Sequence, residues 1–169
     1  MRLYRSIRLA FVSVAMAAAG CASYSGFGLV PGRSTAEDVV ATMGEPALER
    51  AGPGGERVLW YPRLPYGRES FAARLGPDGK LIAVEQRLQP EFFGRIEPGR
   101  STADDVLDLI GPPYEIYHYP RTQREVWEYQ LNLPPAHKNL YVQFSPDRVV
   151  REVYQLHDFR AQRLFPFLP

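Results

Sequence analysis

This 169-residue sequence has one cysteine, almost no net charge and no long apolar segment. Its one cysteine, Cys21, excludes an intramolecular disulfide bond. The 20 Lys and Arg residues nearly balance the 19 Asp and Glu residues, which leaves no electrostatic case for nucleic-acid binding. The apolar run at residues 9–19 is too short to span a bilayer. The chain therefore has to fold without disulfide bonds, and the apolar run needs another explanation.

Motifs for catalysis and for metal binding are also scarce. His118, His137 and His157 lie 19 and 20 residues apart, and no cysteine accompanies them to complete a metal site. The chain has no Gly-x-Ser-x-Gly nucleophile motif. His157 and Asp158 could form a base and the group that orients it, but no nucleophile is indicated. We therefore expect no catalytic residue, no metal, no cofactor and no enzymatic activity.

A nine-residue motif, in contrast, occurs twice. Residues 31–39 (P-G-R-S-T-A-E-D-V) recur 67 residues later as residues 98–106, with Asp104 in place of Glu37. Further residues match at the same offset: Gly44, Pro46 and Trp60 correspond to Gly111, Pro113 and Trp127. The second copy is then two residues longer. A match of this length predicts two tandem repeats, in which both tryptophans are equivalent and buried in the core.

Each motif predicts the start of a short helix. A hydroxyl can cap the first N–H groups in either copy, and the candidates are Ser34, Thr35, Ser101 and Thr102. Which hydroxyl is the cap stays open, because both pairs have an acidic residue at capping-box spacing. The acidic residues that follow are also favoured by the helix dipole. Gly44 and Gly111 end the two helices.

Alternating segments after each helix predict strands. They lie at residues 47–50, 57–61, 70–75 and 80–88 in the first copy and at 114–119, 125–131, 139–144 and 149–156 in the second. The predicted fold is α+β, with each repeat formed by one or two short helices packed on a three- to four-stranded antiparallel meander. The repeats span residues 28–89 and 94–157. Because a unit of ~60 residues is marginally stable alone, we expect them to pack together.

The N-terminus predicts export. Residues 1–20 combine a basic start with the apolar run, as a signal peptide does. Residues 18–21 (A-A-G-C) resemble the lipobox of bacterial lipoproteins, which implies cleavage before Cys21 and its diacylation. An ordinary secretory signal is the alternative. Residues 21–27 then form a tether, and alanine at position 22 implies outer-membrane sorting. Without residues 1–20 the chain has 17 basic and 19 acidic residues, because three arginines are removed.

The order of these features resembles a family of small outer-membrane lipoproteins that includes the BamE (SmpA/OmlA) subunit of the β-barrel assembly machinery. The match rests on Gly32, Thr35, Val39, Gly44, Pro46, Trp60, Asp78 and Gly79, and on Gly99, Thr102, Val106, Gly111, Pro113, Trp127, Tyr129 and Asp147. That subunit has one repeat, whereas this chain has two. Arg148 also replaces the turn glycine in the second copy.

The resemblance implies a lipid-anchored outer-membrane protein that faces the periplasm and binds or scaffolds an envelope partner. The process it implies is outer-membrane protein assembly or envelope integrity, with the assembly machinery as partner. The tandem arrangement also resembles the secreted β-lactamase-inhibitor proteins, which bind an enzyme through an aromatic-rich concave sheet. The alternative function is therefore an inhibitor or regulator of an envelope hydrolase.

One aromatic cluster belongs to the second copy alone. Tyr114, Tyr117 and Tyr119 have no aromatic counterparts in the first copy, and Arg121 and Arg124 follow in the turn. Tyrosine and arginine are enriched at protein interfaces. We therefore predict a partner-binding surface here. The alternative is that this face packs on the first repeat. Residues 158–169 form a tail that belongs to neither repeat.

Overall fold

This computed structural model describes residues 23, 25–63, 67–133 and 137–158. The predicted signal segment, Cys21 and residues 159–169 of the tail lie outside them. Two antiparallel four-stranded sheets form in chain order. Sheet 1 contains β1 (Leu48–Ala51), β2 (Arg57–Pro62), β3 (Ser70–Leu75) and β4 (Leu81–Gln86). Sheet 2 contains β5 (Glu115–Tyr119), β6 (Arg124–Leu131), β7 (Lys138–Phe144) and β8 (Val150–His157). The predicted α+β class with two repeated sheet units is confirmed.

Three helices and one 3-10 turn accompany the sheets in the described residues. The helix α1 (Ala36–Met43) precedes sheet 1, and α3 (Ala103–Ile110) precedes sheet 2. The short α2 (Pro90–Phe93) lies in the linker, and the 3-10 turn η1 (Pro53–Gly55) joins β1 to β2. No helix within the described residues is long and apolar enough to cross a bilayer.

The threonines cap both helices. Thr102 Oγ1 accepts the backbone N–H of Asp105 at 3.2 Å, and the Asp105 carboxylate accepts the backbone N–H of Thr102 at 2.7 Å. Thr35 and Asp38 form the same capping box on α1. Two of the four otherwise unpaired N-terminal groups are satisfied in this way. The choice that the sequence leaves open is thus settled for threonine.

The preceding serines have a different role from the predicted one. Ser34 Oγ accepts the backbone N–H of Val30 at 3.0 Å, and Ser101 Oγ accepts that of Glu97 at 2.9 Å. Each serine therefore closes the turn that leads into the helix. The assignment of Ser34 and Ser101 as helix caps is wrong, because their side chains point back toward that turn.

Each helix covers the inner face of its own sheet. Val39 and Met43 of α1 pack on Leu59, Tyr61, Phe71, Ala73, Leu75 and Leu81. Ala103, Val106 and Ile110 of α3 pack on Trp127, Tyr129, Leu131, Leu140, Val142, Phe144 and Val150. Leu88, Phe93 and Ile96 from the linker join this second core. The core of the second unit therefore includes residues that precede its predicted start at residue 94.

Trp60 and Trp127 lie on opposite faces of their sheets, although both are buried. The backbone N–H of Ala47 bonds to Trp60 O, and that of Tyr114 bonds to Glu128 O. Glu128 is therefore the structural counterpart of Trp60. One more residue separates the paired positions in the second hairpin than in the first. Since side chains alternate along a strand, this residue moves the tryptophan to the other face. The predicted equivalence of the tryptophans is wrong.

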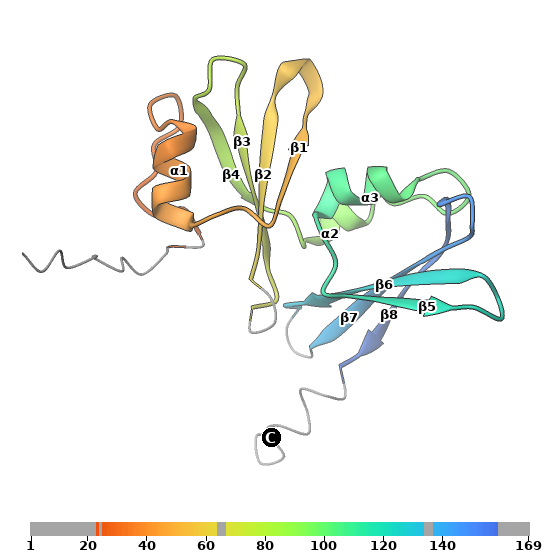
Figure 1. Ribbon diagram of the computed structural model, residues 1–169. Helices are drawn as coiled ribbons and strands as arrows, with labels where there is room; N and C mark the ends of the chain where they lie inside the picture. Colours follow the sequence, from red (N-terminus) through yellow and green to blue (C-terminus); the bar gives the residue numbers. More distant parts are fainter. Residues whose placement is uncertain (1–22, 24, 64–66, 134–136, 159–169) are drawn as a thin grey trace, which may run out of the picture.

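The outer face of sheet 1, which is turned away from α1, carries Trp60 and packs on the second repeat. A Cβ atom added to Gly111, directly after α3, would lie 2.4 Å from Cε3 of the Trp60 ring. Trp60 is 0% exposed, and Arg50 on the same face bonds to Asp104 and Asp108 of α3. The layers thus follow the order α1, sheet 1, α2 with α3, sheet 2 (Figure 1).

Candidate functional site

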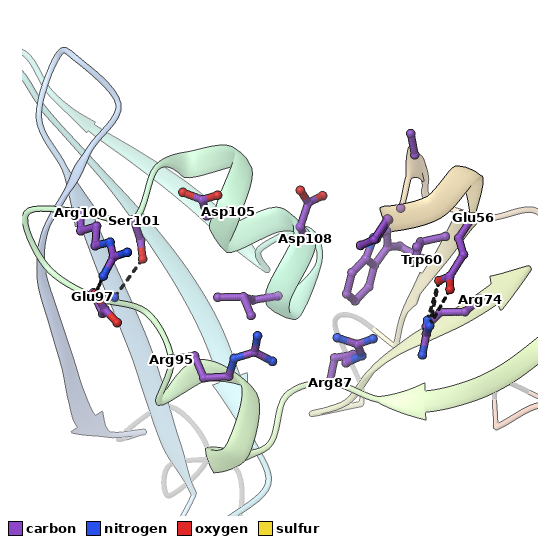
Figure 2. Close-up of a pocket in the computed structure, with 15 residues that line it drawn as sticks. Glu56, Trp60, Arg74, Arg87, Arg95, Glu97, Arg100, Ser101, Asp105 and Asp108 are labelled. Atoms are coloured by element: carbon purple, nitrogen blue, oxygen red, sulfur yellow. Dashed lines mark hydrogen bonds and ion pairs between the residues drawn. The ribbon is translucent and has the colours of Figure 1, made fainter.

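A groove of about 550 Å³ lies beside the contact between the repeats. Its walls come from sheet 1, from the linker that holds α2, and from α3. They include Val58, Trp60, Arg74, Arg87, Arg95, Asp105, Asp108 and Leu109. Figure 2 shows Arg87 and Arg95 directed into the groove from the two sides. The groove is therefore a feature of the junction between repeats, formed by both of them.

Most charges on the groove walls are already paired. Arg74 donates to both oxygens of Glu56 at 2.8 to 3.0 Å. Arg100 pairs with Glu97 at 3.1 Å, and Arg50 pairs with Asp108 at 2.5 Å. Of these ion pairs, only the one between Arg50 of β1 and Asp108 of α3 joins the two repeats. The Arg74–Glu56 pair lies within the first repeat, and the Arg100–Glu97 pair lies in the turn before α3.

Three donors remain at the groove. The buried Trp60 Nε1 and Arg87 Nε have no hydrogen-bond acceptor among the described residues, and Arg95 has no ion-pair partner there. Such donors could hold a small anion. The lining nevertheless carries four arginines and four acidic residues, so its charges balance. The groove therefore has no strong preference for a ligand of either sign.

The outer face of sheet 2, which is turned away from α3, is the second candidate. Strand register places Glu115, Glu128, Tyr141 and Tyr154 in one row across it. The adjacent row holds Tyr117, Val126, Gln143 and Glu152. Tyr119 with Arg124 and Gln130 with Asn139 and Leu156 flank these rows. Among the described helices, none packs on this face, since α2 and α3 belong to the opposite core.

Glu128 lies at the centre of this outer face. Its carboxylate accepts a hydrogen bond from Tyr117 Oη at 2.7 Å and one from Asn139 Nδ2 at 2.9 Å. The residue is 0% exposed. Burial of a carboxylate is costly unless hydrogen bonds compensate, and these two bonds also fix where the tyrosine and the amide point. Glu128 therefore organises the polar centre of the face.

Exposed aromatic and aliphatic side chains surround that centre. Tyr119 is 52% exposed, Tyr154 is 38% exposed and Leu156 is 52% exposed. The rings of Tyr141 and Tyr154 stack with their centroids 5.3 Å apart. Partial burial is the largest cause that raises the pKa of Tyr154, followed by the nearby Tyr119 and Tyr141. The tyrosines thus form one continuous cluster across β5, β7 and β8.

The predicted interface residues divide between this face and its borders. Tyr117 and Tyr119 lie together on the outer face, as predicted, and Arg124 lies opposite Tyr119 at the start of β6. Tyr114 is half-buried and precedes β5, while Arg121 is exposed in the turn. Tyr119 is exposed, and the contacts between the repeats include Trp60 against Gly111, Arg50 with α3, and Arg68 with Asp158.

Sequence reasoning missed the rest of the face. Tyr141, Tyr154, Asn139 and Leu156 come from strands that follow the tyrosine-rich segment by 20 residues or more. Alternation along β6 places Glu128 and Trp127 on opposite faces of the sheet. A search for outward tyrosines in the last two strands would have extended the cluster.

The histidines and Asp158, which the sequence offers as candidates for catalysis or metal binding, make the following contacts. His118 contacts Glu125 at 3.4 Å at an exposed rim, and Asp158 pairs with Arg68 of the first repeat. His137 offers its carbonyl oxygen to the Asp158 N–H at 2.9 Å. The described residues contain no group of three or more His, Cys, Asp or Glu side chains that could hold a metal ion.

The fold and this face define a two-repeat α+β module with one aromatic, acidic sheet surface. No protein-family model and no curated protein matches the chain. Among solved structures, a DUF4309 family protein (YjgB) from Bacillus subtilis subsp. subtilis str. 168 aligns with 19% identity. The alignment covers 78% of this chain and 84% of that one, at a TM-score of 0.29. So low a TM-score supports no conclusion about fold or function.

Proposed function

We propose that the protein is a non-enzymatic, lipid-anchored module of the cell envelope that binds a protein partner through the outer face of sheet 2. One observation carries the proposal. The corresponding face of sheet 1 packs on the second repeat through Trp60 and Arg50, whereas the face of sheet 2 presents the exposed Tyr119, Tyr154 and Leu156. Tyrosine provides a large contact area with few rotatable bonds. Such a surface suits protein recognition.

The anchor and the compartment rest on the sequence. The basic and apolar leader, the A-A-G-C segment and the otherwise cysteine-free chain support lipidation of Cys21 and attachment to the outer membrane on its periplasmic side. The resemblance to BamE-like lipoproteins supports the β-barrel assembly machinery as the partner. An inhibitor or regulator of an envelope hydrolase is the second candidate. The β-lactamase-inhibitor proteins bind an enzyme through an aromatic-rich sheet, and sheet 2 carries a tyrosine cluster.

Cross-linking in intact cells tests the function. A photoreactive amino acid at Tyr119 should cross-link a partner, whereas the same group at Ile82, which is 40% exposed on sheet 1, should give little product. A fatty-acid analogue should label the wild type, and Cys21→Ser should abolish the label. Assembly subunits in the cross-linked product favour the first role, and a single hydrolase favours the second. Equal products at both positions, or equal labelling, would contradict the proposal.

A further inference from the structure

The buried polar atoms that remain unpaired at the groove between the repeats are all donors. Trp60 Nε1 and Arg87 Nε have no acceptor among the described residues, and the two side chains are 0% and 13% exposed. Within the described part of the groove lining, no buried acceptor lacks a partner. Buried polar atoms in folded proteins nearly always form hydrogen bonds. The groove therefore requires an acceptor.

The guanidinium of Arg87 is held in place from two directions. Its Nη2 lies 2.5 Å from a carboxylate oxygen of Glu85, and its Cζ lies 4.5 Å from the centroid of the Phe92 ring in α2. An arginine that is fixed in this way loses little side-chain freedom when a ligand binds. Arg87 thus offers its unpaired Nε at a defined position.

Arg95 provides a positive charge that has no ion-pair partner among the described residues. It is exposed and lies in the linker between α2 and α3. Arg87 and Arg95 reach into the groove from its two sides (Figure 2). An acceptor that enters between them can therefore bond to both guanidinium groups.

The acidic residues of the lining limit the charge of that acceptor. They are already engaged, and their partners are Arg74 for Glu56, Arg100 for Glu97, Thr102 for Asp105 and Arg50 for Asp108. The lining carries as many acidic residues as arginines. A group with one negative charge therefore fits better than a group with two, because the second charge would meet no further cation.

The rest of the lining is largely apolar. Ala51, Pro53, Val58 and Leu109 contribute to the walls together with Trp60. The volume of about 550 Å³ far exceeds that of a single acceptor group and lies in the range of small-molecule sites. A ligand that fills the groove therefore joins its acceptor group to an apolar body.

We propose that the groove between the repeats binds an organic carboxylate, which accepts hydrogen bonds from Arg87, Arg95 and the Trp60 N–H and places its apolar body on Val58 and Leu109. The flat guanidinium group matches the two oxygens of a carboxylate. The site uses side chains of both repeats and is separate from the outer face of sheet 2. It thus goes beyond the proposed function.

The indole N–H signals of the two tryptophans test the proposal in the full-length protein. Trp127 Nε1 already donates to Glu125 at 2.6 Å, so its signal is an internal reference. In proton–nitrogen correlation spectra, phenylbutyrate should move the Trp60 signal downfield in a saturable manner and leave the Trp127 signal in place. The variant Trp127→Phe assigns the two signals. A Trp60 signal that does not respond would show that water alone satisfies the donors, which overturns the proposal.

Matched ligands separate the carboxylate from the apolar body. Phenylbutanol has the same body without the charge and should bind roughly tenfold more weakly than phenylbutyrate, because charge-assisted hydrogen bonds are lost. Phenylbutyl phosphate carries a second charge and should also bind more weakly. Equal binding of the alcohol would show that the apolar walls suffice. Tighter binding of the phosphate would show that the ligand class is wrong, and either result overturns the proposal.

Matched variants locate the site. Arg95→Gln should weaken binding of phenylbutyrate roughly tenfold, and the fold should survive because the side chain is exposed. Arg95→Lys should restore part of the affinity. Arg33→Gln removes the same charge from an exposed turn before α1 and should leave the affinity unchanged. Equal effects of Arg95→Gln and Arg33→Gln would refute the site. Cross-linking at Tyr119 is independent of these results, so failure of the carboxylate site is distinguishable from failure of the proposed function.

Discussion

At the scale of single residues, Gly111 and Gly44 both end a helix, but only Gly111 also packs against the other repeat. Both follow a helix with positive φ, +79° for Gly111 and +87° for Gly44. Only Gly111 has a neighbour in the way of a Cβ atom, namely the Trp60 ring. Tyr129 Oη also donates to Gly111 O at 3.0 Å. The hydroxyl of its counterpart Tyr61 has no partner among the described residues, and burial raises the pKa of Tyr61 to about 12.

Alanine at these two glycines should therefore differ in cost. Gly44→Ala should lower the free energy of unfolding by roughly 1–2 kcal/mol, because alanine disfavours positive φ. Gly111→Ala should cost about 1–3 kcal/mol more, since Trp60 has to move from a packed site. Urea denaturation of the two variants measures the difference. Equal costs would show that Trp60 does not press on Gly111.

At the scale of elements, the capping boxes make helix stability depend on acidic pH. The pKa of the Asp105 carboxyl lies below its usual 3.8, chiefly because the carboxylate accepts the Thr102 backbone N–H and then because it accepts the Thr102 hydroxyl. A lowered folded-state pKa means that this contribution is complete above pH 3.8 and is lost as the pH falls through the lower folded value.

Asp105→Asn should remove that dependence. At pH 7 the variant should unfold with roughly 0.5–1 kcal/mol less free energy, because asparagine lacks the charge that the helix dipole favours. Between pH 4 and pH 2 its stability should fall less steeply than that of the wild type. Thermal melts across this range give the comparison, and Glu91→Gln, at an exposed position of α2, provides the control. Parallel curves for wild type and Asp105→Asn would contradict the role of the cap.

The elements also show what the sequence can predict. Helix starts, glycine stops and the inward positions of β3, β6 and β7 follow from capping chemistry and alternation, which are local. That Glu128, and not Trp127, is the structural counterpart of Trp60 depends instead on the length of a hairpin. One extra residue in the hairpin moves every side chain that follows to the other face of the strand. The tyrosines of β7 and β8 join the site through sheet register, which a single strand does not reveal. Lipidation of Cys21 stays a prediction.

At the scale of the whole molecule, the two repeats are joined through one buried side chain, that of Trp60. Trp60 belongs to the first repeat by sequence but is buried by the second, against Gly111. Burial of a tryptophan contributes roughly 3–5 kcal/mol. The free energy of unfolding of a unit the size of one repeat is little larger than this contribution, and no disulfide bond compensates for its loss. The two repeats should therefore depend on each other to stay folded.

A fragment that ends at Gln89 tests this dependence, because Trp60 is then its one tryptophan. We expect red-shifted Trp60 emission and a broad, shallow thermal transition, since the cover from Gly111 and α3 is absent. The full-length variant Trp127→Phe is the matched reference, as Trp60 is its one tryptophan too and lies at the intact junction. It should show blue-shifted emission and one cooperative transition. A fragment that melts sharply with blue-shifted emission would show that the first repeat folds independently, and Trp60 would then be an accessory to the junction instead of its requirement.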